Sequence, residues 1–322
     1  MKKYDVAALG ELLIDFTENG TSSQGNPILE ANPGGAPCNV LAMLSQLGKK
    51  TAFLGKVGKD SFGSQLEAAL QEAGINTSGL KRDQNVNTTL AFVHTKEDGD
   101  REFSFYRNPG ADMMLEEADL ETDLLRQCRI FHFGSLSMTH ERCRKATQRA
   151  VAVAEESGAL LSFDPNLRSA LWADLEEARE QICYGLAHCQ ILKISDNEIQ
   201  WLTNEEDFDK GIAQIQEKYK IPLIFLSMGK SGSRAYTRNL RVEQPAFVQE
   251  HTIETTGAGD TFMGAVLNAV LDYGWNEYEA VQLEEMLRFA NAAASLVTTR
   301  KGALRVMPER REIETLIRGG GK

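Results

Sequence analysis

The sequence predicts an α/β fold with a mostly parallel central sheet that helices cover on both faces. Short apolar runs alternate with amphipathic stretches of helical period along nearly the whole chain, and glycines end several of these stretches. One region breaks the alternation, because two extended runs flank an Asp-Gly pair and favour a separate small sheet. A chain of 322 residues can bury one large core with such an appendage, so we expect a single domain over residues 1–322.

The main sheet is expected from apolar runs that are each short enough to be one strand. They cover residues 6–14, 51–58, 130–135, 159–166, 190–195 and 221–229. The expected helices cover residues 38–47, 62–73, 142–156, 175–186, 209–218, 261–271 and 285–297. Gly48, Gly74 and Gly158 stand where a left-handed residue commonly ends a helix. Strands separated by helices of this length form βαβ units, whose strands lie parallel.

The separate small sheet is expected from segments near residues 16–33 and 88–108. The stretch "TTLAFVHTKEDGDREFSFYR" has extended runs on both sides of residues 97–100, and an Asp-Gly pair in such a position is a strong hairpin signal. Residues 16–30 also lack helical periodicity. The alternative is that these residues form an irregular surface loop, and periodicity alone does not exclude it.

The composition disfavours several classes of partner. The formal net charge of −11 argues against non-specific binding to nucleic acid or anionic membranes, although a local positive site can still hold an anionic ligand. The five cysteines include no Cys-x-x-Cys pair and the five histidines show no metal-ligand spacing. No window approaches a membrane span, and acidic residues interrupt any signal-peptide core at the N-terminus. We therefore expect a cytoplasmic protein without nucleic-acid or membrane partners.

Two nucleotide-binding motifs are missing from the places where they would have to lie. A dinucleotide fold needs G-x-G-x-x-G after its first strand, but here that strand leads into "LGELLID", which has one glycine. The segment "MGKSG" resembles the end of a P-loop, yet Ile224 occupies the position of the required earlier glycine. A dehydrogenase and a Walker-type NTPase are therefore both disfavoured.

A first glycine-rich loop, "NPGGAPCNVLAMLSQLG" at residues 32–48, precedes an expected helix. Parallel sheets bind ligands where their strands end, and glycines let a polar ligand approach the backbone closely. Asn39 lies one turn inside the helix and offers both a donor and an acceptor. A simple turn followed by a helix start is the alternative.

A second glycine-rich loop, "TTGAGD" at residues 255–260, ends in a carboxylate. Its small residues let backbone N–H groups converge on an anion at the start of a helix. A carboxylate beside an anion site suits a base that takes a proton from a nucleophile attacking a phosphoryl group held there. The loop alone leaves a second interpretation open, in which Asp260 only caps the helix.

Together, the two loops resemble the signatures of the ribokinase-like (PfkB-type) carbohydrate kinases. "GGAPCNVLAMLSQLG" with "GKVGKDSFG" resembles the first signature of that family, and "TTGAGDTFMGAV" resembles the second. The resemblance spans nearly the whole chain and implies a three-layer αβα sandwich with a small β-sheet lid. Within the family, "GELLIDF", "FYRNPGADMML", "FHFGSLSM" and "FDPNLRSALW" resemble segments of the fructokinases. The 2-keto-3-deoxygluconate kinases are the next most similar group.

The resemblance also implies roles in sugar binding and catalysis for individual residues. Asp260 matches the catalytic base of the family. The anion hole corresponds to Gly257, Ala258 and Gly259. The sugar-binding positions correspond to Asp15, Gly34, Gly35 and Asn39. Arg107 and Arg168 are candidates for contact with sugar hydroxyls or with the phosphoryl group, and a surface salt bridge is the alternative for each.

The nucleotide and metal positions follow from the same resemblance. The nucleotide-binding positions correspond to Lys193, Ser195, Glu198, Ser227, Gly229, Gly232 and Asn291. Glu198 would contact Mg²⁺ indirectly, although the family often has Asn where this chain has Ser195. The family usually has Asp where this chain has Glu254, at a monovalent-cation site that would also involve Thr256. We therefore expect activity to depend only weakly on K⁺.

The sequence thus predicts an ATP-dependent sugar kinase that phosphorylates the primary hydroxyl of a free ketose, D-fructose to fructose 6-phosphate. Its cofactors would be ATP and Mg²⁺, with K⁺ as an optional third. The lid would exclude water and pair two copies into a homodimer. A 2-keto-3-deoxygluconate kinase is the alternative, and a non-catalytic sugar-binding sensor on the same fold is the alternative from another functional class.

Overall fold

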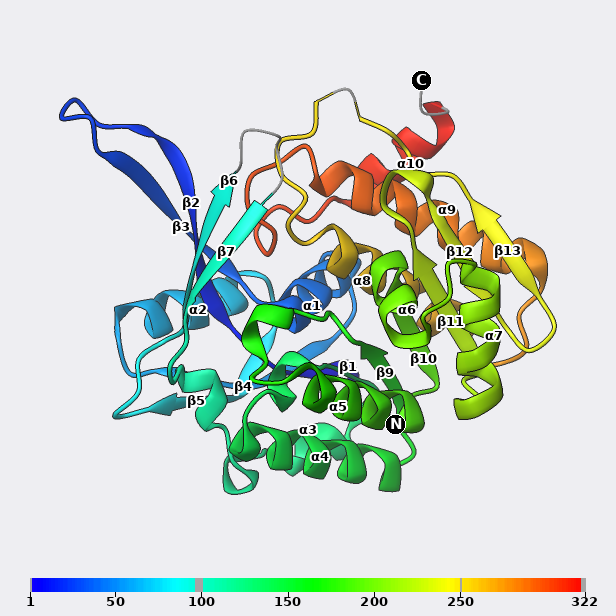
Figure 1. The fold of residues 1–322 in the computed structure, drawn as a ribbon, viewed down its shortest axis with the longest axis horizontal. Coiled ribbons are helices and arrows are strands. Elements are labelled where there is room, and N and C mark those ends of the chain that lie inside the picture. Colours follow the sequence, from blue (N-terminus) through cyan, green and yellow to red (C-terminus); the bar gives the residue numbers. More distant parts are fainter. Residues whose placement is uncertain (1, 96–100, 250, 320–322) are drawn as a thin grey trace.

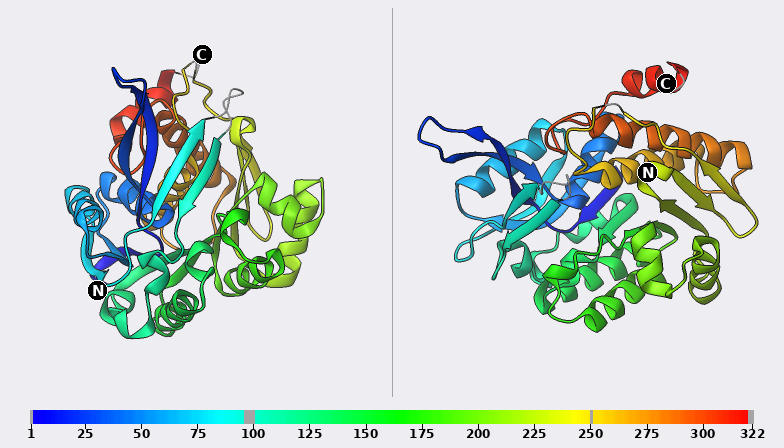
Figure 2. Two further views of the ribbon diagram at one scale, coloured as in Figure 1. Left: turned by 60° about the vertical axis from the view of Figure 1, so that its left-hand side comes forward. Right: turned by 45° about the horizontal axis from the view of Figure 1, so that its top comes forward.

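The main feature of the fold is a mostly parallel sheet with a layer of helices on each face (Figures 1 and 2). The computed structural model describes residues 2–95, 101–249 and 251–319, and within these ranges nine strands form the sheet. In spatial order they are β13 (Arg241–Gln244), β12 (Ser233–Tyr236), β11 (Leu223–Ser227), β10 (Ile191–Ser195), β9 (Leu160–Asp164), β8 (Cys128–Gly134), β1 (Tyr4–Leu9), β4 (Thr51–Gly58) and β5 (Asn76–Asp83). Neighbours from β11 to β5 pair in parallel, whereas β12 and β13 are antiparallel additions at one edge. The predicted sheet is confirmed.

Side chains of the strands alternate between two hydrophobic clusters, one on each face of the sheet. On β1, Val6 and Ala8 belong to one cluster, whereas Ala7 and Leu9 belong to the other. The first cluster packs against α1 (Ala36–Gln46), α2 (Ser61–Glu72), α8 (Ala258–Tyr273), α9 (Ala280–Val297) and α10 (Arg310–Gly319). The second packs against α3 (Thr122–Arg126), α4 (Glu141–Glu156), α5 (Leu175–His188), α6 (Asp196–Thr203) and α7 (Phe208–Tyr219). The chain therefore forms the expected three-layer αβα sandwich.

Short 3₁₀ helices complete the secondary structure; they cover Ala111–Met114, Glu117–Asp119, Leu136–Met138, Ser169–Leu171 and Gly229–Ser231. In the described part of the chain, none of the helices combines the length and apolar character that a bilayer crossing requires.

A second sheet stands at one side of the sandwich and confirms the predicted small β-sheet. Four strands in the described residues form it, in the order β3 (Pro27–Gly34), β2 (Leu13–Thr21), β6 (Leu90–Thr95) and β7 (Arg101–Tyr106). The β2–β3 hairpin projects beyond the body of the molecule in Figures 1 and 2. Phe16 of β2 stacks on Phe92 of β6 at 5.0 Å and meets Phe62 of α2 edge-on at 5.7 Å, which attaches this sheet to the sandwich. The predicted turn at residues 97–100 lies outside the described residues.

Three sequence-based boundaries were wrong. The strand expected over residues 6–14 is divided between β1 and β2, because Leu12, Leu13 and Ile14 are also buried and the apolar run continues through the turn. The helix expected at residues 261–271 begins at Ala258, and the one expected at 285–297 begins at Ala280. Strands β5, β12 and β13 and helices α3, α6 and α10 were not expected, since they are short or carry many polar residues.

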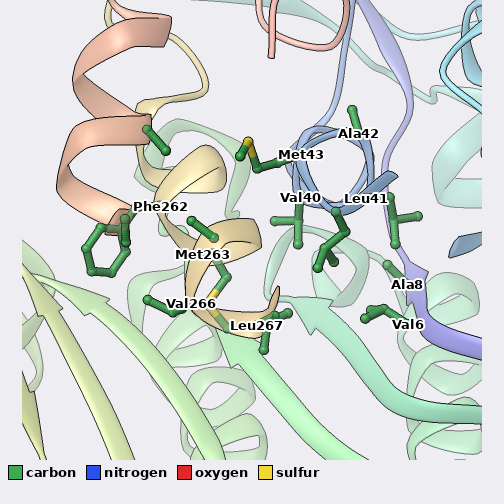
Figure 3. Packing of buried hydrophobic residues seen from close by; sticks show 14 of the residues in the cluster. Val6, Ala8, Val40, Leu41, Ala42, Met43, Phe262, Met263, Val266 and Leu267 are labelled. Carbon is green, nitrogen blue, oxygen red and sulfur yellow. The ribbon is translucent and has the colours of Figure 1, made fainter. Parts of the chain in front are cut away.

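The close approach of α1 and α8 is the packing feature that matters most for the site. Val40 and Met43 lie on the side of α1 that faces α8 (Figure 3). A methyl group on the α carbon of Gly264 in α8 would lie 2.7 Å from the Cβ of Met43 and 2.9 Å from the carbonyl oxygen of Val40. Gly264 is therefore required for the two helices to come this close.

We predict that Gly264→Ala destabilises the protein, although alanine normally favours a helix interior. The extra methyl meets backbone and a Cβ that cannot swing away, so overpacking should lower the free energy of unfolding by about 1–3 kcal/mol. Urea unfolding of both proteins would measure this. The control is Gly319→Ala, because a methyl group there meets no atom of the described residues within 4 Å. Equal stability of Gly264→Ala and wild type would show that α1 and α8 adjust freely.

Candidate active site

A cavity of about 550 Å³ opens where the parallel strands end, with the small sheet as one of its walls. Glu11, Leu136, Ser195 and Ser227 line it from positions at or just after the ends of β1, β8, β10 and β11. The small sheet contributes Leu13, Asp15 and Phe105, and the glycine-rich loops contribute Gly35, Asn39, Gly257, Gly259 and Asp260. The cavity thus brings together polar groups that are far apart in the chain, at the edge where open parallel sheets bind ligands.

A second cavity of about 310 Å³ adjoins the first. Its walls carry more apolar groups, among them Phe247, Phe262 and Ala294. Three residues line both cavities: Ser227, Thr255 and Gly259. The two cavities therefore meet at the glycine loop, so a ligand in one can react with a ligand in the other at that point.

Asp260 lies at this junction, inside the first turn of α8. Gly257, with φ of 77°, is the residue before the helix, and α8 begins at Ala258. Asn39 donates its side-chain N–H to Oδ2 of Asp260 at 2.8 Å. Asp260 is therefore not the N-cap, and the capping interpretation is wrong.

The surroundings of Asp260 suit a proton acceptor. Burial raises the pKa of its carboxyl, while the hydrogen bond from Asn39 and the positive charges of Lys193 and Arg168 oppose that rise. A carboxylate with a raised pKa is a stronger base than a free one. The N-terminus of α8 also supplies backbone N–H groups and a partial positive charge for an anion beside it.

Asp15 is the acid of the small sheet, and two glycines make room around it. The pKa of Asp15 is raised to about 7. Burial is the largest cause, and the negative charges of Glu254 and Glu11 are the next. A methyl group on Gly34 would lie 2.1 Å from Oδ2 of Asp15. Gly35 has φ of 130°, and a methyl group there would lie 2.4 Å from the carbonyl oxygen of Glu11. A side chain at Gly34 would therefore collide with the carboxylate of Asp15, and one at Gly35 would collide with the backbone of Glu11.

Glu11 is a site residue that the sequence analysis missed. Its Oε1 accepts the backbone N–H of Ala36 at 2.7 Å, so it caps α1 in place of Gly35, which has no side chain. Burial raises its pKa to about 7. The available signal was a glutamate directly after the first strand, in "GELLIDF", where a parallel sheet places ligand groups.

The two arginines proposed for substrate contact lie in different settings. Arg107 is buried against Asp112, with Nε and Nη2 at 2.8 and 2.6 Å from the same carboxylate oxygen, and it is not among the residues that line either cavity. Its predicted contact with the substrate is therefore not supported. Its guanidinium instead donates to the carbonyl oxygen of Leu136, which lines the larger cavity. Arg168 lines that cavity and is exposed.

Glu198 and Ser195 form a capping box at the start of α6. Oε2 of Glu198 accepts the backbone N–H and the hydroxyl of Ser195 at 2.8 Å each, and Oε1 accepts the backbone N–H of Leu167 at 2.8 Å. Both oxygens already accept hydrogen bonds from the protein, which is consistent with the predicted indirect contact of Glu198 with a metal ion. Among the described residues, no three His, Cys, Asp or Glu side chains cluster as a metal site. This donor set fits Mg²⁺, which proteins commonly hold through nucleotide phosphates and water.

The residues predicted to contact the nucleotide are divided between the two cavities. The smaller one is lined by Ser227, Gly229, Gly232 and Asn291, whereas the larger one is lined by Lys193, Ser195 and Glu198, and also by Ser227. Asn291 lies in the wall of the smaller cavity, accepts a hydrogen bond from Ser233 at 2.8 Å, and donates to the carbonyl oxygens of Gln244 and Pro245 at 3.1 and 3.0 Å. The side-chain amide of Asn291 therefore stabilises the cavity wall through these hydrogen bonds. Gly232 has φ of 98°, and a methyl group there would lie 2.2 Å from the oxygen of Gln244. Gly229 lies in the same loop, at a φ of 52°.

Glu254 ties the second glycine loop to a neighbouring loop. It is buried, and its Oε2 accepts the backbone N–H of Gly302 at 2.9 Å. Its own backbone N–H donates to the carbonyl oxygen of Thr298 at 3.0 Å. Thr256, the other residue proposed for a monovalent cation, lines the larger cavity.

Comparison with known proteins agrees with this geometry. The model of the pfkB family of carbohydrate kinases matches residues 3–310. A probable fructokinase-4 of Arabidopsis thaliana is 40% identical over 316 residues, which cover 98% of this chain and 97% of that protein. The crystal structure of a fructokinase from Xylella fastidiosa with bound ATP superposes with a TM-score of 0.90 at 30% identity and covers 100% of both chains.

A fructokinase double mutant from Vibrio cholerae, in a form with fructose, ADP and potassium ion bound, has a TM-score of 0.87 at 26% identity and covers 98% of this chain and 99% of that one. The ribokinase-like fold implied by the sequence resemblance is therefore confirmed. With a family match over nearly its whole length and full-length relatives at this identity, the chain belongs to the pfkB family of carbohydrate kinases.

Proposed function

We propose that this enzyme transfers the γ-phosphoryl group of ATP to the primary hydroxyl of D-fructose and forms fructose 6-phosphate. The observation that carries the proposal is the position of Asp260 beside the N-terminus of α8, where two cavities meet. Its carboxylate accepts a hydrogen bond from Asn39 at 2.8 Å. The names of its relatives support the choice of fructose and ATP.

In the proposed reaction, Asp260 accepts the proton of the sugar hydroxyl as that oxygen attacks the phosphorus. The new bond joins the sugar oxygen to phosphorus, and the bond that breaks joins phosphorus to the oxygen of ADP. The backbone N–H groups of Gly257 and Gly259, at the start of α8, would stabilise the charge that develops on the phosphoryl oxygens, whereas the N–H of Ala258 donates to the carbonyl oxygen of Thr255 at 3.3 Å. When bound, Mg²⁺ supplies positive charge that neutralises the phosphates.

The chemistry of the residues that line each cavity indicates which substrate it binds. The larger one carries Asp15 and Asn39, whose oxygens can accept sugar hydroxyls. Oδ1 of Asn39 is buried without a partner among the described residues, so it is available for such a hydroxyl. The smaller cavity, with Phe247 and Phe262 in its walls, suits the flat, apolar faces of an adenine.

The small sheet is proposed to act as the lid. Asp15 and Phe105 project from β2 and β7 into the cavity, so the sheet covers a bound sugar and keeps water from the phosphoryl group. The homodimer expected through this sheet remains a prediction, as do the single-domain organisation and the cytoplasmic location.

The charges around the cavity favour a neutral sugar over 2-keto-3-deoxygluconate. That substrate carries a carboxylate, which needs a free cation beside it. Asp112 already neutralises Arg107, the charge of Arg168 is screened by solvent because this side chain is exposed, and Glu11 and Asp15 add acidic groups to the sugar end of the cavity. A sensor without activity is also disfavoured, because Asp260 and the glycine loop are both present in the site.

We predict that fructose is the best acceptor in a panel that also contains 2-keto-3-deoxygluconate, ribose and a nucleoside. The measurement is ATP-dependent release of ADP in a coupled assay, compared as kcat/KM. A preference for 2-keto-3-deoxygluconate would overturn the assignment and would make Arg168 the partner of its carboxylate. If none of these acceptors is phosphorylated, the proposal of a ketose kinase loses its support.

We predict that Asp260→Asn folds and binds ATP but loses turnover. Loss of a general base should lower kcat by about 10²–10⁴-fold. The matched control is Asp272→Asn on the same helix, which removes an exposed carboxylate paired with Lys49 and should keep wild-type kcat. In wild type, kcat should also fall as the pH drops through the raised pKa of Asp260, since the base must be ionised. Turnover of Asp260→Asn within a few-fold of wild type would leave this carboxylate without a catalytic role.

We predict that activity depends only weakly on K⁺ and that Glu254→Asp increases the dependence. The carboxylate of Glu254 already joins the glycine loop to Gly302, a connection that an ion beside the loop would otherwise have to make. The shorter aspartate should lose this bond and leave the loop less ordered. The comparison is kcat/KM for ATP in K⁺ and in a bulky organic cation at equal ionic strength, for both proteins. A strong K⁺ requirement in wild type that the substitution weakens would contradict this view.

A further inference from the structure

Arg107 and Asp112 form a buried ion pair at the base of the small sheet. Their side chains are 4% and 3% exposed, and Nη2 and Nε of Arg107 lie 2.6 and 2.8 Å from Oδ2 of Asp112. A buried pair adds little net stability, because the desolvation of both charges offsets their attraction, and apolar residues of similar volume often stabilise a protein as well or better. The pair is therefore better explained by the arrangement that it imposes on its neighbours than by stability.

The carboxylate of Asp112 joins the bases of neighbouring strands. Its Oδ2 accepts from Arg107, which directly follows β7, and its Oδ1 accepts the hydroxyl of Thr89, which directly precedes β6. The carbonyl oxygen of Thr89 in turn accepts the backbone N–H of Ile14 in β2 at 3.2 Å. Strands β2, β6 and β7 thus meet around this carboxylate.

The base of the sheet is packed tightly around the same carboxylate, because Gly110 has no side chain. A methyl group on the α carbon of Gly110 would lie 1.8 Å from the hydroxyl oxygen of Thr89 and 2.7 Å from Oδ1 of Asp112. Any larger residue would therefore separate the two groups. Three positions of the chain, 89, 110 and 112, are matched to one another at this point.

Arg107 connects the base of the sheet to the wall of the larger cavity. Its Nη1 donates to the hydroxyl of Thr139 at 2.8 Å and its Nη2 to the carbonyl oxygen of Leu136 at 3.2 Å, both in the segment that follows β8. Leu136 lines the larger cavity, and so does Phe105, which stands two residues before Arg107 in the chain. The guanidinium thus ties a wall residue of the small sheet to a wall residue of the sandwich.

The chemistry of arginine suits this connection. Its planar guanidinium holds several N–H donors in fixed directions, so one side chain can bind a carboxylate, a hydroxyl and a carbonyl oxygen together. Because Asp112 neutralises the charge, the connection adds no net charge beside the cavity. Arg107 and Asp112 are not among the residues that line either cavity, so their effect on a substrate must pass through other residues.

We propose that Arg107 and Asp112 are positioning residues, which hold the small sheet where Asp15 and Phe105 reach the sugar. The proposal rests on the sugar kinase activity proposed above and assigns the anchor of its lid. Loss of the pair should release the sheet and weaken the use of the sugar. The smaller cavity should keep its shape, because its lining residues start at Ser227 and belong to other elements.

The test is Arg107→Met combined with Asp112→Leu, which removes both charges so that neither remains buried without a partner. The measurements are kcat/KM for the sugar that wild type phosphorylates best and the Kd of a non-hydrolysable ATP analogue without sugar. The value of kcat/KM should fall at least about tenfold, while the Kd of the analogue changes within about threefold. A merely structural defect would affect both quantities.

The matched control is Arg144→Met combined with Glu177→Leu. Arg144 and Glu177 form an ion pair between α4 and α5, outside the lining of both cavities. Arg144 also donates to the carbonyl oxygen of Met138 at 3.0 Å, so it contacts the segment after β8 from helix α4 and not from the small sheet. The control should keep the wild-type kcat/KM for the sugar.

A second variant covers the case in which the double variant does not fold. Thr139→Val leaves the ion pair in place but removes the partner of Nη1. Loss of one hydrogen bond should lower kcat/KM for the sugar by about threefold or more and leave the Kd of the analogue unchanged. An unchanged kcat/KM in Thr139→Val would then count against the proposal.

Comparable losses for the sugar and the analogue in the double variant, or a smaller fall in kcat/KM than expected, would overturn the proposal. A similar fall in the control would also overturn it, because the order of the segment after β8, and not the small sheet, would then limit the reaction. A wild type that phosphorylates no sugar would contradict the proposed function and this inference with it. A preferred sugar other than fructose would leave the inference intact, because the measurement uses the best acceptor.

Discussion

The site depends on one hydrogen bond between the starts of two helices. Asn39 near the start of α1 and Asp260 near the start of α8 are separated by 221 positions in the chain and meet at 2.8 Å. This contact exists because Gly264 lets the two helices pack closely. Both helices therefore point their partially positive ends at one place, and the carboxylate lies between them. The general base and the anion site are two consequences of the same packing.

Three buried glutamates order the loops around that point. Glu11 accepts the backbone N–H of Ala36, Glu198 that of Leu167, and Glu254 that of Gly302. Each bond satisfies a backbone donor of a loop, so each loop is held before a substrate arrives. Preorganised N–H groups need no reorientation when charge develops on a phosphoryl group. The glutamates thus contribute to chemistry without contact with the substrate.

Two carboxylates, Glu11 and Asp15, also place acidic groups in the site. Burial raises the pKa of both Glu11 and Asp15 to about 7, which means that their ionised forms are disfavoured in the folded state. Between the pKa of an unfolded carboxyl and about 7, the folded protein binds more protons, so this part of the stability decreases as the pH rises through that window. A polyanionic nucleotide adds to the repulsion. Lys193 and the helix N-termini are the groups that oppose it.

The sequence by itself determined the α/β class, the mostly parallel sheet, the small second sheet and the two glycine loops. These follow from periodicity, from glycines before helices and from short apolar runs, all of which are local signals. It also singled out Asp260 and Asn39, since each lies at or just after a glycine-rich loop that precedes a helix. The family resemblance added the sugar-kinase chemistry and the nucleotide positions.

Tertiary structure decided what local patterns do not contain. It split the first apolar run between two sheets, because buried residues continue through the turn at Gly10. It took Arg107 out of the cavity by placing Asp112 against it, and it brought in Glu11, which is an ordinary strand-end acid in the sequence. Whether a charged side chain faces a substrate or a partner depends on groups that only folding brings within a few ångströms, and Coulomb energy depends on that distance and on burial.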